Sequence, residues 1–338
     1  MGKINTTFLI TGGGGYLGSV LVPMLLVKGY KVIVIDRFFW GKEVFKKHLT
    51  DKNLFLIKKD TRAIQKKDLK DVDVVIDLAS LSNDPTGEIN PKNTLEINHL
   101  ARVRTAKMAK LMGVKKYILA SSCSVYGFRD AILDEKSKLS PITTYAKASA
   151  LAEKDTLKLS NKKFSVTILR QGTLYGISPR MRFDLVVNTM VLSYFKDKHI
   201  SVLGGEQWRP LLHVADSARA FIKVAEENEK NINGEIFNVG EDKQNYQIKN
   251  LAKLIAKTLD QNPKIAIENA QSDFRSYRVS FNKIHRKLGF KAKENPSKTA
   301  KELYKALKMD KVRFTLETKT LDWYKHLLSK NPKILENR

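Results

Sequence analysis

Residues 6–19 read TTFLITGGGGYLGS, a short apolar run that passes directly into a glycine-rich turn. The run Thr6–Thr11 predicts a buried strand, and the apolar positions of residues 20–26 predict one face of a helix. Glycine suits the turn because its backbone bends tightly, approaches a phosphate without a Cβ atom, and lets the helix pack against the strand. A glycine turn alone is weak evidence. Its place between a strand and a helix predicts a dinucleotide-binding α/β fold.

A carboxylate ends the second predicted strand. Residues Lys31–Ile35 read KVIVI, and Asp36 follows 18 residues after Gly18. A carboxylate there suits the ribose hydroxyls of NAD and repels the 2′-phosphate of NADP. Arg37 could receive that phosphate, so NAD is the preferred cofactor and NADP stays the alternative.

Strand and helix patterns alternate along the first half of the chain. Further strands are predicted at residues 53–58, 72–78, 117–120 and 165–170, and helices at residues 94–112 and 144–159. The continuous run Val74-Val75-Ile76 fits a parallel strand covered on both faces. We therefore expect an α/β fold with a Rossmann-type doubly wound parallel sheet. The nucleotide-binding domain should span residues 1–176 and be rejoined by about 211–240, while residues 177–210 and 241–330 should form a smaller, partly interleaved substrate lobe.

The net charge is +26, from 61 lysines and arginines against 35 acidic residues. The basic residues are scattered, often as lysine pairs such as Lys46-Lys47 and Lys162-Lys163, with no arginine-rich arm or aromatic platform. This distribution argues against a nucleic-acid partner. An excess of positive field would still attract an anionic substrate such as a nucleotide diphosphate.

No apolar run approaches the roughly 20 residues that cross a bilayer, and the first residues lack a signal-peptide pattern. The six histidines show no metal-ligand spacing. The single cysteine, Cys123, is expected to pack at a strand end. We expect a cytoplasmic protein with no membrane partner and no metal, whose last lysine-rich residues are frayed or form a surface helix.

A serine and a tyrosine are placed as a hydroxyl pair. Residues 120–127 read ASSCSVYG, so a strand would end at Ser121-Ser122, and residues 141–153 read PITTYAKASALAE, so Tyr145 would open the next helix. The carboxyl ends of parallel strands face the ligand crevice. A phenol with an ordinary pKa of about 10 needs a nearby cation to act as a general acid or base near neutral pH.

These segments resemble the extended short-chain dehydrogenase/reductase family, the NAD-dependent sugar-nucleotide epimerases and dehydratases. Its SS-x-x-VYG segment and Tyr-x-x-x-Lys helix imply Ser122 and Tyr145 as catalytic residues, whereas Ser149 stands where the family has lysine. Lys147 and Lys154 are rotated from the face of Tyr145 by about 200° and 180° along the helix. Three explanations stay open: the charge of NAD with a water held by Ser149, a cation from another segment, or weak catalysis.

The resemblance also implies a set of cofactor contacts. Asp60-Thr61-Arg62 is similar to the family's adenine-binding segment, and Leu78-Ala79-Ser80 to its His-Leu-Ala-Ala strand end, with Asp77 in place of histidine. The implied cofactor residues are Gly12, Gly15, Tyr16, Leu17, Gly18, Asp36, Arg37, Asp60, Thr61, Leu78, Ala79, Ser80 and Asn98.

The implied substrate is a nucleotide-diphosphate sugar. Its predicted contacts are Thr173, Arg180, Arg182, Asn188, Arg209 and Arg275. A guanidinium suits a diphosphate because its fork donates two charge-assisted hydrogen bonds. Thr173 stands where the family often has asparagine, which leaves the sugar open.

The expected activity is epimerisation or oxidation and reduction at the sugar 4-position. Family dehydratases carry an Asp-Glu pair where this chain has Cys123 and Ser124, so 4,6-dehydration is disfavoured. A catalytically weak NAD and sugar-nucleotide binding or sensing protein is the alternative. A hydrolase built from Ser122, His213 and Asp216 is disfavoured because no Gly-x-Ser-x-Gly elbow surrounds the serine. A homodimer is implied by the resemblance.

Overall fold

The computed structural model describes residues 6–260, 264–268 and 276–336. Its centre is a seven-stranded sheet with the order β11-β7-β5-β4-β1-β2-β3, in which every pairing is parallel. The strands are β1 (Thr7–Thr11), β2 (Lys31–Asp36), β3 (Leu54–Lys58), β4 (Val74–Asp77), β5 (Lys116–Ser122), β7 (Ser165–Gln171) and β11 (Glu235–Val239). The predicted doubly wound parallel sheet is confirmed.

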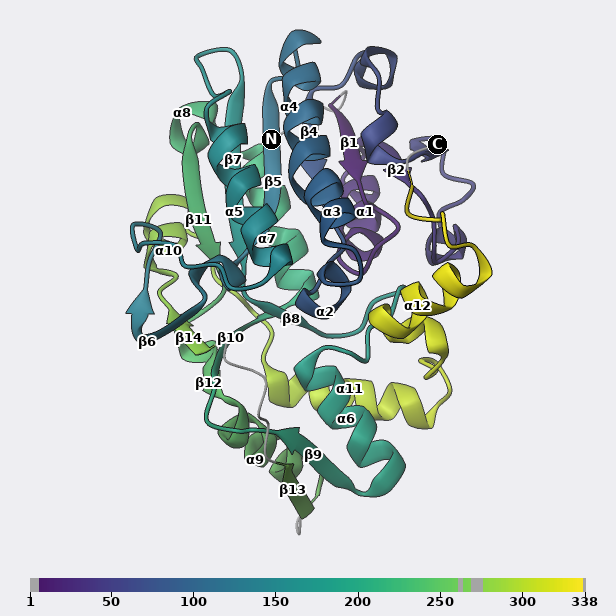
Figure 1. Cartoon of the computed structure of the whole chain (residues 1–338), viewed down its shortest axis with the longest axis vertical. Helices are drawn as coiled ribbons and strands as arrows, with labels where there is room; N and C mark the ends of the chain where they lie inside the picture. The colour runs from purple at the N-terminus through teal and green to yellow at the C-terminus, as the bar shows by residue number, and fades with distance from the viewer. Residues whose placement is uncertain (1–5, 261–263, 269–275, 337–338) are drawn as a thin grey trace.

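Helices cover both faces of this sheet (Figure 1). Helices α1 (Gly18–Val27) and α7 (Val214–Glu226) share one core with Phe8 and Ile10 of β1, whereas Leu9 joins a second core with α4 (Arg102–Leu111) and α5 (Thr144–Leu157). Neighbouring residues of a strand face opposite sides. Both faces of the sheet are therefore apolar, which explains why these strands read as continuous apolar runs.

The helix predicted at residues 94–112 is interrupted. It consists of α3 (Pro91–Leu95), a π-helical turn at Glu96–Ala101, and α4. A π-turn adds a residue to the helical repeat and rotates the following side chains. The apolar residues Leu95, Leu100, Val103, Ala106 and Leu111 of the sequence predict a packed face on this helix. Leu100 and Leu111 are 57% and 71% exposed, so that part of the prediction is wrong.

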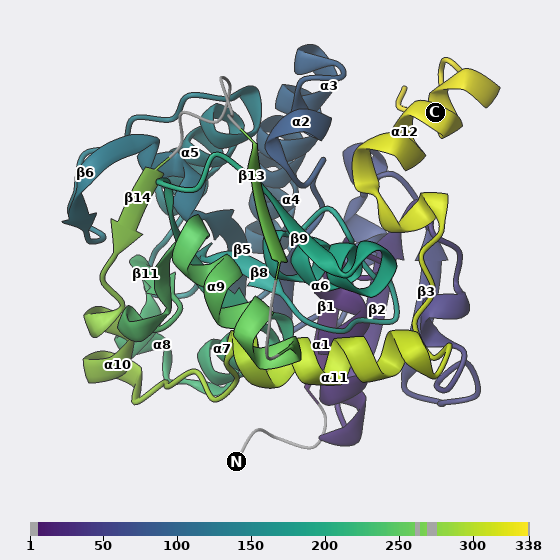
Figure 2. The ribbon, with the colours of Figure 1, turned by 90° about the horizontal axis from the view of Figure 1, so that it is seen from below.

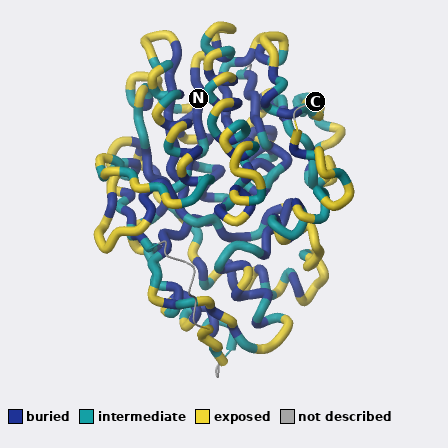
Figure 3. The backbone as a smooth tube through the Cα atoms, viewed as in Figure 1, coloured by how far each residue is buried: buried dark blue, intermediate teal, exposed yellow. Residues whose placement is uncertain are grey.

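A second group of elements lies below the sheet in Figure 1 and in front of it in Figure 2. Its core joins α6 (Val186–Asp197), α9 (Ile248–Leu259), α11 (Pro296–Lys308) and β9 (His199–Leu203), which pairs with β13 (Lys264–Glu268). The apolar faces of these helices point inward and their outer surfaces are exposed (Figure 3).

Smaller elements connect the two groups. Strands β12 (Asn245–Gln247), β10 (Trp208–His213) and β8 (Thr173–Tyr175) form a three-stranded sheet, and β14 (Ser276–Val279) pairs with β6 (Phe128–Leu133). Helix α9 begins at Ile248, and the preceding Tyr246 pairs with Arg209 between β12 and β10. The remaining short helices are α2 (Asp84–Gly87), α8 (Glu229–Ile232) and α10 (Asn282–Leu288).

The last helix, α12 (Thr320–Lys330), is regular and not frayed. It lies beside the segment that follows β2 (Figure 1), where the Tyr324 ring meets the rings of Phe39 and Trp40 at centroid distances of 5.7 and 5.5 Å. Trp323 Nε1 donates a hydrogen bond to the Phe39 carbonyl at 2.9 Å. Residues from the two ends of the chain therefore pack together. Within the described ranges, no helix is long and apolar enough to cross a membrane.

Candidate active site

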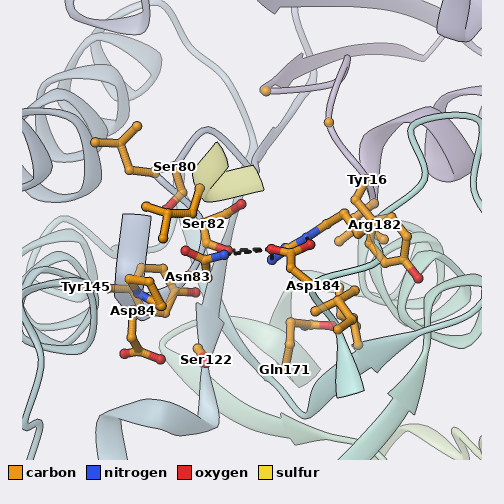
Figure 4. A pocket seen from close by; sticks show the side chains of 18 of the residues that line it. Tyr16, Ser80, Ser82, Asn83, Asp84, Ser122, Tyr145, Gln171, Arg182 and Asp184 are labelled. Atoms are coloured by element: carbon orange, nitrogen blue, oxygen red, sulfur yellow. Dashed lines mark hydrogen bonds and ion pairs between the residues drawn. The ribbon is translucent and has the colours of Figure 1, made fainter. Parts of the chain in front are cut away.

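A cavity of about 730 Å³ opens at the carboxyl ends of β1, β4 and β5 (Figure 4). Its volume is in the range of small-molecule and cofactor sites. The predicted residues that line it are Gly12, Gly15, Tyr16, Leu17, Gly18, Asp36, Arg37, Asp60, Thr61, Leu78, Ala79, Ser80, Ser122, Tyr145, Thr173, Arg180, Arg182 and Arg209.

The glycine turn has no room for side chains. A Cβ atom on Gly12, whose φ is +67°, would lie 2.7 Å from Ala79 Cα, and one on Gly18 would lie 2.4 Å from the Gly13 carbonyl oxygen. None of the described residues accepts a hydrogen bond from the backbone N–H groups of Tyr16 and Leu17, just before α1. Free N–H groups at a helix N-terminus favour an anion. The turn therefore fits a dinucleotide diphosphate.

Asp36 lies at the end of β2 beside this turn. Its carboxylate accepts hydrogen bonds from the backbone N–H groups of Gly14 at 2.9 Å and Phe38 at 2.6 Å. Burial raises the pKa of this carboxyl group. Arg37, the alternative 2′-phosphate ligand, is engaged elsewhere: it donates hydrogen bonds to Asp60 and to the Ile334 carbonyl, both at 2.8 Å.

Asp60, the predicted adenine contact, is held by two guanidinium groups. Arg62 donates to both of its carboxylate oxygens at 3.0 Å, and Arg37 forms the third ion-paired contact. Burial opposes the charge, but these hydrogen bonds hold the pKa of Asp60 below its ordinary value. Arg62 also donates to the Leu335 carbonyl. The segment after α12 therefore closes this end of the cavity.

Tyr145 and Ser122 lie together at the other end (Figure 4). Tyr145 is in the first turn of α5, where the Thr143 hydroxyl caps the helix by accepting from the Ala146 N–H at 3.2 Å. Burial and the Asp84 carboxylate raise the pKa of the Tyr145 phenol, whereas hydrogen bonding with Ser122 lowers it. The two hydroxyls thus form one polar group in an otherwise enclosed position.

A polar bridge crosses the cavity between the two groups of elements. Asn83 Nδ2 donates to Asp184 Oδ2 at 2.8 Å, and Arg182 Nη1 donates to the Ser82 carbonyl at 3.2 Å (Figure 4). Arg182 also forms a two-pronged ion pair with Asp184 at 3.0 and 2.8 Å. We call these four residues, Ser82, Asn83, Arg182 and Asp184, the interlobe bridge.

Arg180 carries unused hydrogen-bond donors. Its guanidinium stacks on the Trp40 ring at 3.9 Å from the centroid, and Nη2 donates to the Thr320 hydroxyl at 3.0 Å. Its buried Nε and Nη1 atoms have no acceptor among the described residues. Burial and the neighbouring Arg182 lower the pKa of Arg180 to about 9. An anion in the cavity would satisfy both donors and stabilise the charge.

Arg209 and Thr173 line the cavity from the sheet formed by β10 and β8. The Arg209 guanidinium is buried, lies 5.7 Å from the Tyr277 ring centroid, and donates to the Trp208 carbonyl at 2.8 Å. Arg209 is far from the glycine turn in the sequence but lines the same cavity. A residue that contacts a second phosphorylated ligand is expected to lie there.

Comparison with known proteins agrees with this geometry. The model of the NAD dependent epimerase/dehydratase family matches residues 8–240. The chain belongs to this family. The family relationship confirms the predicted resemblance and the NAD cofactor, and it places the chain among NAD-dependent enzymes that modify sugar nucleotides.

Individual members of the epimerase/dehydratase family are distant in sequence. A putative UDP-glucose 4-epimerase of Methanocaldococcus jannaschii is 31% identical over 70% of this chain and 77% of its own length. UDP-glucuronic acid decarboxylase 4 of Arabidopsis thaliana is 28% identical over 84% of this chain, which spans only 65% of that protein. MoeE5, solved in complex with UDP-glucose and NAD, is 25% identical with a TM-score of 0.79, covering 90% of this chain and all of MoeE5.

Two predicted contact residues of this epimerase/dehydratase chain stand behind the cavity wall. Ser149 is buried, and its hydroxyl donates to the Tyr145 carbonyl at 2.9 Å. Asn98 accepts from the Leu81 N–H at 2.9 Å and donates to the Leu81 carbonyl at 3.3 Å. Neither lines the cavity. The polar atoms of Ser149 and Asn98 hold the backbone by hydrogen bonds. Their geometry therefore supports the cavity wall and does not provide direct contact with the cofactor.

Asn188 is a third residue that supports the site without lining the cavity. Its side chain accepts from the Gly176 N–H at 2.9 Å and donates to the Arg182 carbonyl at 2.8 Å. It thereby fixes the segment that carries the predicted substrate arginines. The remaining predicted contact, Arg275, lies outside the described residues.

His213 and Asp216 have structural partners. His213 Nδ1 accepts from the Ala215 N–H at 3.2 Å and caps α7, while Asp216 accepts from the N–H groups of Lys293 and Glu294. Neither residue lines the cavity with Ser122, so no hydrolase triad forms. Across the described part of the chain, no group of three or more His, Cys, Asp or Glu side chains could hold a metal ion.

The sequence did not reveal Arg102, which lines the cavity. Its Nε donates to the Ala79 carbonyl and its Nη1 to the Ala120 carbonyl, both at 2.9 Å. The interlobe-bridge residues Ser82, Asn83 and Asp184 were also missed. A cluster of polar residues after a predicted strand end was the available signal for Ser82 and Asn83, whereas a single arginine in a helix gives no such signal.

Proposed function

We propose that this chain epimerises a nucleotide-diphosphate sugar at the 4-position, by oxidation to the 4-ketone and reduction from the opposite face. The observation that carries the proposal is that the hydroxyl pair Tyr145 and Ser122 lines the same cavity as the glycine turn at Gly12–Gly18. Bound NAD supplies the hydride acceptor for the oxidation. The contacts between NAD and the predicted cofactor residues are part of this proposal.

Tyr145 acts on the proton of the reacting hydroxyl. As phenolate, its Oη takes the proton from the 4-hydroxyl during oxidation and returns it to the same oxygen during reduction. Ser122 Oγ shares a hydrogen bond with that oxygen and fixes its position. Because the Ser122 hydroxyl is itself oriented by accepting from the Ser124 N–H at 3.1 Å, little ordering is needed when substrate binds.

Arginines hold the charged part of the substrate. Arg209 faces the cavity from β10, and Arg180 offers two unpaired donors. The Arg182 guanidinium is neutralised by Asp184, so it orients polar groups more than it attracts charge. Two cationic positions in one cavity suit the cofactor diphosphate and the substrate diphosphate.

Dehydration across the sugar 4- and 6-positions fits this site poorly. Cys123 is buried, its thiol donates to the Arg170 carbonyl at 3.5 Å, and burial raises the pKa of that thiol. Ser124 presents a hydroxyl and no carboxylate. An elimination needs an acid and a base beside Ser122, and these two side chains supply neither.

The test is turnover by the purified chain with NAD on UDP-, GDP- and dTDP-sugars, followed by NMR of the products. The proposal expects a 4-epimer, and Tyr145→Phe should abolish its formation while NAD still binds. A decarboxylated or dehydrated product would refute epimerisation and retain oxidation at the 4-position. Bound NAD and sugar nucleotide with no product would support the binding-protein alternative.

We also infer that two copies of the chain associate through α4 and α5. Leu100 of the π-turn and Leu151 of α5 are exposed to 57% and 39%, and the two elements pack against each other. Apolar side chains grouped on one surface favour burial against a partner. Leu100→Glu should give a monomer in light scattering, with Lys257→Glu, an exposed position on α9 away from this surface, as the control. An unchanged mass for Leu100→Glu would contradict the inference.

A further inference from the structure

Arg102 is a buried cation that the proposed mechanism has not yet used. Its side chain is 3% exposed and reaches the cavity between the carboxyl ends of β4 and β5, where Ala79 and Ala120 accept its hydrogen bonds. No described residue accepts a hydrogen bond from Nη2. A guanidinium in this position keeps part of its charge available to the cavity.

A buried carboxylate balances this charge. Asp77 Oδ1 lies 3.7 Å from Arg102 Nε and also accepts from the Thr11 hydroxyl at 2.6 Å, while Oδ2 accepts from the Tyr117 hydroxyl. Asp77 is the residue that stands where the family resemblance expects histidine. A carboxylate in place of histidine is the substitution that allows a permanent cation to be buried next to it.

The π-turn determines where Arg102 points. Residues 96–101 form the turn, and Arg102 is the first residue of the α-helix that follows. The extra residue of a π-turn rotates the next side chain by roughly one residue step, about 100°. Leu100 is thereby left outside and Arg102 is directed into the protein.

Within the described part of the chain, no other cation takes the place of the family lysine. Ser149 is uncharged and hydrogen-bonded within α5, and Lys147 and Lys154 are exposed on the other side of that helix. Arg182 is paired with Asp184. Of the two guanidinium groups that act on the Tyr145 phenol, Arg182 has all three nitrogens bonded, whereas Arg102 keeps Nη2 without an acceptor among the described residues.

We propose that Arg102 supplies the positive charge which Ser149 cannot, and so stabilises the phenolate of Tyr145. This inference rests on the proposed function, and it makes Arg102 a positioning and electrostatic residue that acts through Tyr145. The charged groups around the phenol agree with it. Burial and Asp84 raise the pKa of Tyr145, and Arg102 is the largest influence that lowers it, ahead of Ser122 and Arg182.

The first experiment measures the ionisation of Tyr145 without substrate. Ultraviolet titration of tyrosinate is compared between the protein and its Tyr145→Phe variant, and then between Arg102→Met and Arg102→Met/Tyr145→Phe. Loss of an opposite charge within a few ångströms shifts a pKa by about one to three units. We expect the Tyr145 titration to move up by at least one unit in Arg102→Met and to stay within half a unit in Arg102→Lys.

The second experiment measures turnover against pH. If the proposed function is correct, Arg102→Met should lose about tenfold or more in kcat/KM at neutral pH and recover at high pH, because more of its tyrosine is then ionised. Ser149→Lys added to Arg102→Met should restore part of the loss. A purely structural role for Arg102 would lower activity equally at every pH and would not respond to Ser149→Lys.

Folding is controlled separately. Arg102→Met leaves Asp77 without its charge partner, so Asp77→Asn/Arg102→Met, which removes both charges, is measured beside it. A folded Arg102→Met variant with an unshifted Tyr145 titration would overturn the proposal, and the double variant shows whether any loss of folding comes from the unpaired Asp77. Absence of turnover in the unmodified protein would instead overturn the proposed function, and the titration would still decide the role of Arg102.

Discussion

Glu153→Gln should destabilise this protein far more than removal of a surface carboxylate. Glu153 on α5 receives three hydrogen bonds from Arg170 on β7, at 3.0, 3.1 and 2.7 Å. Both side chains are 3% exposed. The substitution leaves a buried guanidinium without its charge partner, which costs about 3–5 kcal/mol. At about 2 °C per kcal/mol for a chain of this size, the melting temperature should fall by ~6–10 °C.

The assay is thermal and urea unfolding of the protein and three variants. Asp310→Asn is the matched control, because Asp310 pairs with Arg313 on the surface, where the two side chains are 63% and 72% exposed. Such an exposed pair contributes about 0–1 kcal/mol. Glu153→Met/Arg170→Met removes both buried charges and should be more stable than Glu153→Gln.

Two results would refute this reasoning. One is a Glu153→Gln variant that melts within about 2 °C of the unmodified protein, which would mean that water or another group compensates the guanidinium. The other is a double variant as unstable as the single one, which would assign the loss to packing. Because α5 also carries Tyr145, loss of this ion pair should lower activity through disorder of the helix.

Three further changes test the site. Asp84→Asn removes the carboxylate that raises the pKa of Tyr145. The tyrosinate titration and the rising limb of the activity-against-pH curve should therefore shift about one unit to lower pH, opposite to the shift in Arg102→Met. A shift to higher pH would contradict the electrostatic roles assigned to Asp84 and Arg102. Gly18→Ala places a Cβ atom 2.4 Å from the Gly13 carbonyl oxygen, so calorimetry should show at least about tenfold weaker NAD binding, and unchanged affinity would remove the glycine turn from the cofactor site. Trp323→Ala removes the hydrogen bond to the Phe39 carbonyl and should accelerate cofactor release about tenfold in a displacement assay. An unchanged release rate would mean that α12 does not help to retain the cofactor.

The sequence predicted the nucleotide-binding half of the fold because two independent signals coincide there. Continuous apolar runs marked β1, β2 and β4, and a glycine spacing with a physical reason marked the turn after β1. Asp36 and Tyr145 followed from their positions at the end of a strand and the start of a helix. These features depend on local order along the chain, which a sequence displays directly.

Features that depend on rotation or on distant segments could not be predicted. The π-turn rotates the side chains around it, so Arg102 was missed and Leu100 was assigned to packing. The interlobe bridge joins Asn83 to Asp184, about a hundred residues apart, without any pattern in either segment. The sequence showed that Ser149 stands in place of the family lysine. It did not show that the cation we propose in the role of that lysine, Arg102, lies on another helix.

The backbone carbonyls of Ile334 and Leu335 hold Arg37 and Arg62 at the predicted adenine end of the cavity. This arrangement affects whether the cofactor must leave during the reaction cycle. Epimerisation returns the hydride to the sugar, so the nicotinamide ends each turnover in its starting oxidation state and has no need to exchange. A net dehydrogenase must release a reduced dinucleotide every time. A nucleotide pocket closed by the segment after α12 suits the first case, in which NAD stays bound through many turnovers and only sugar nucleotides exchange.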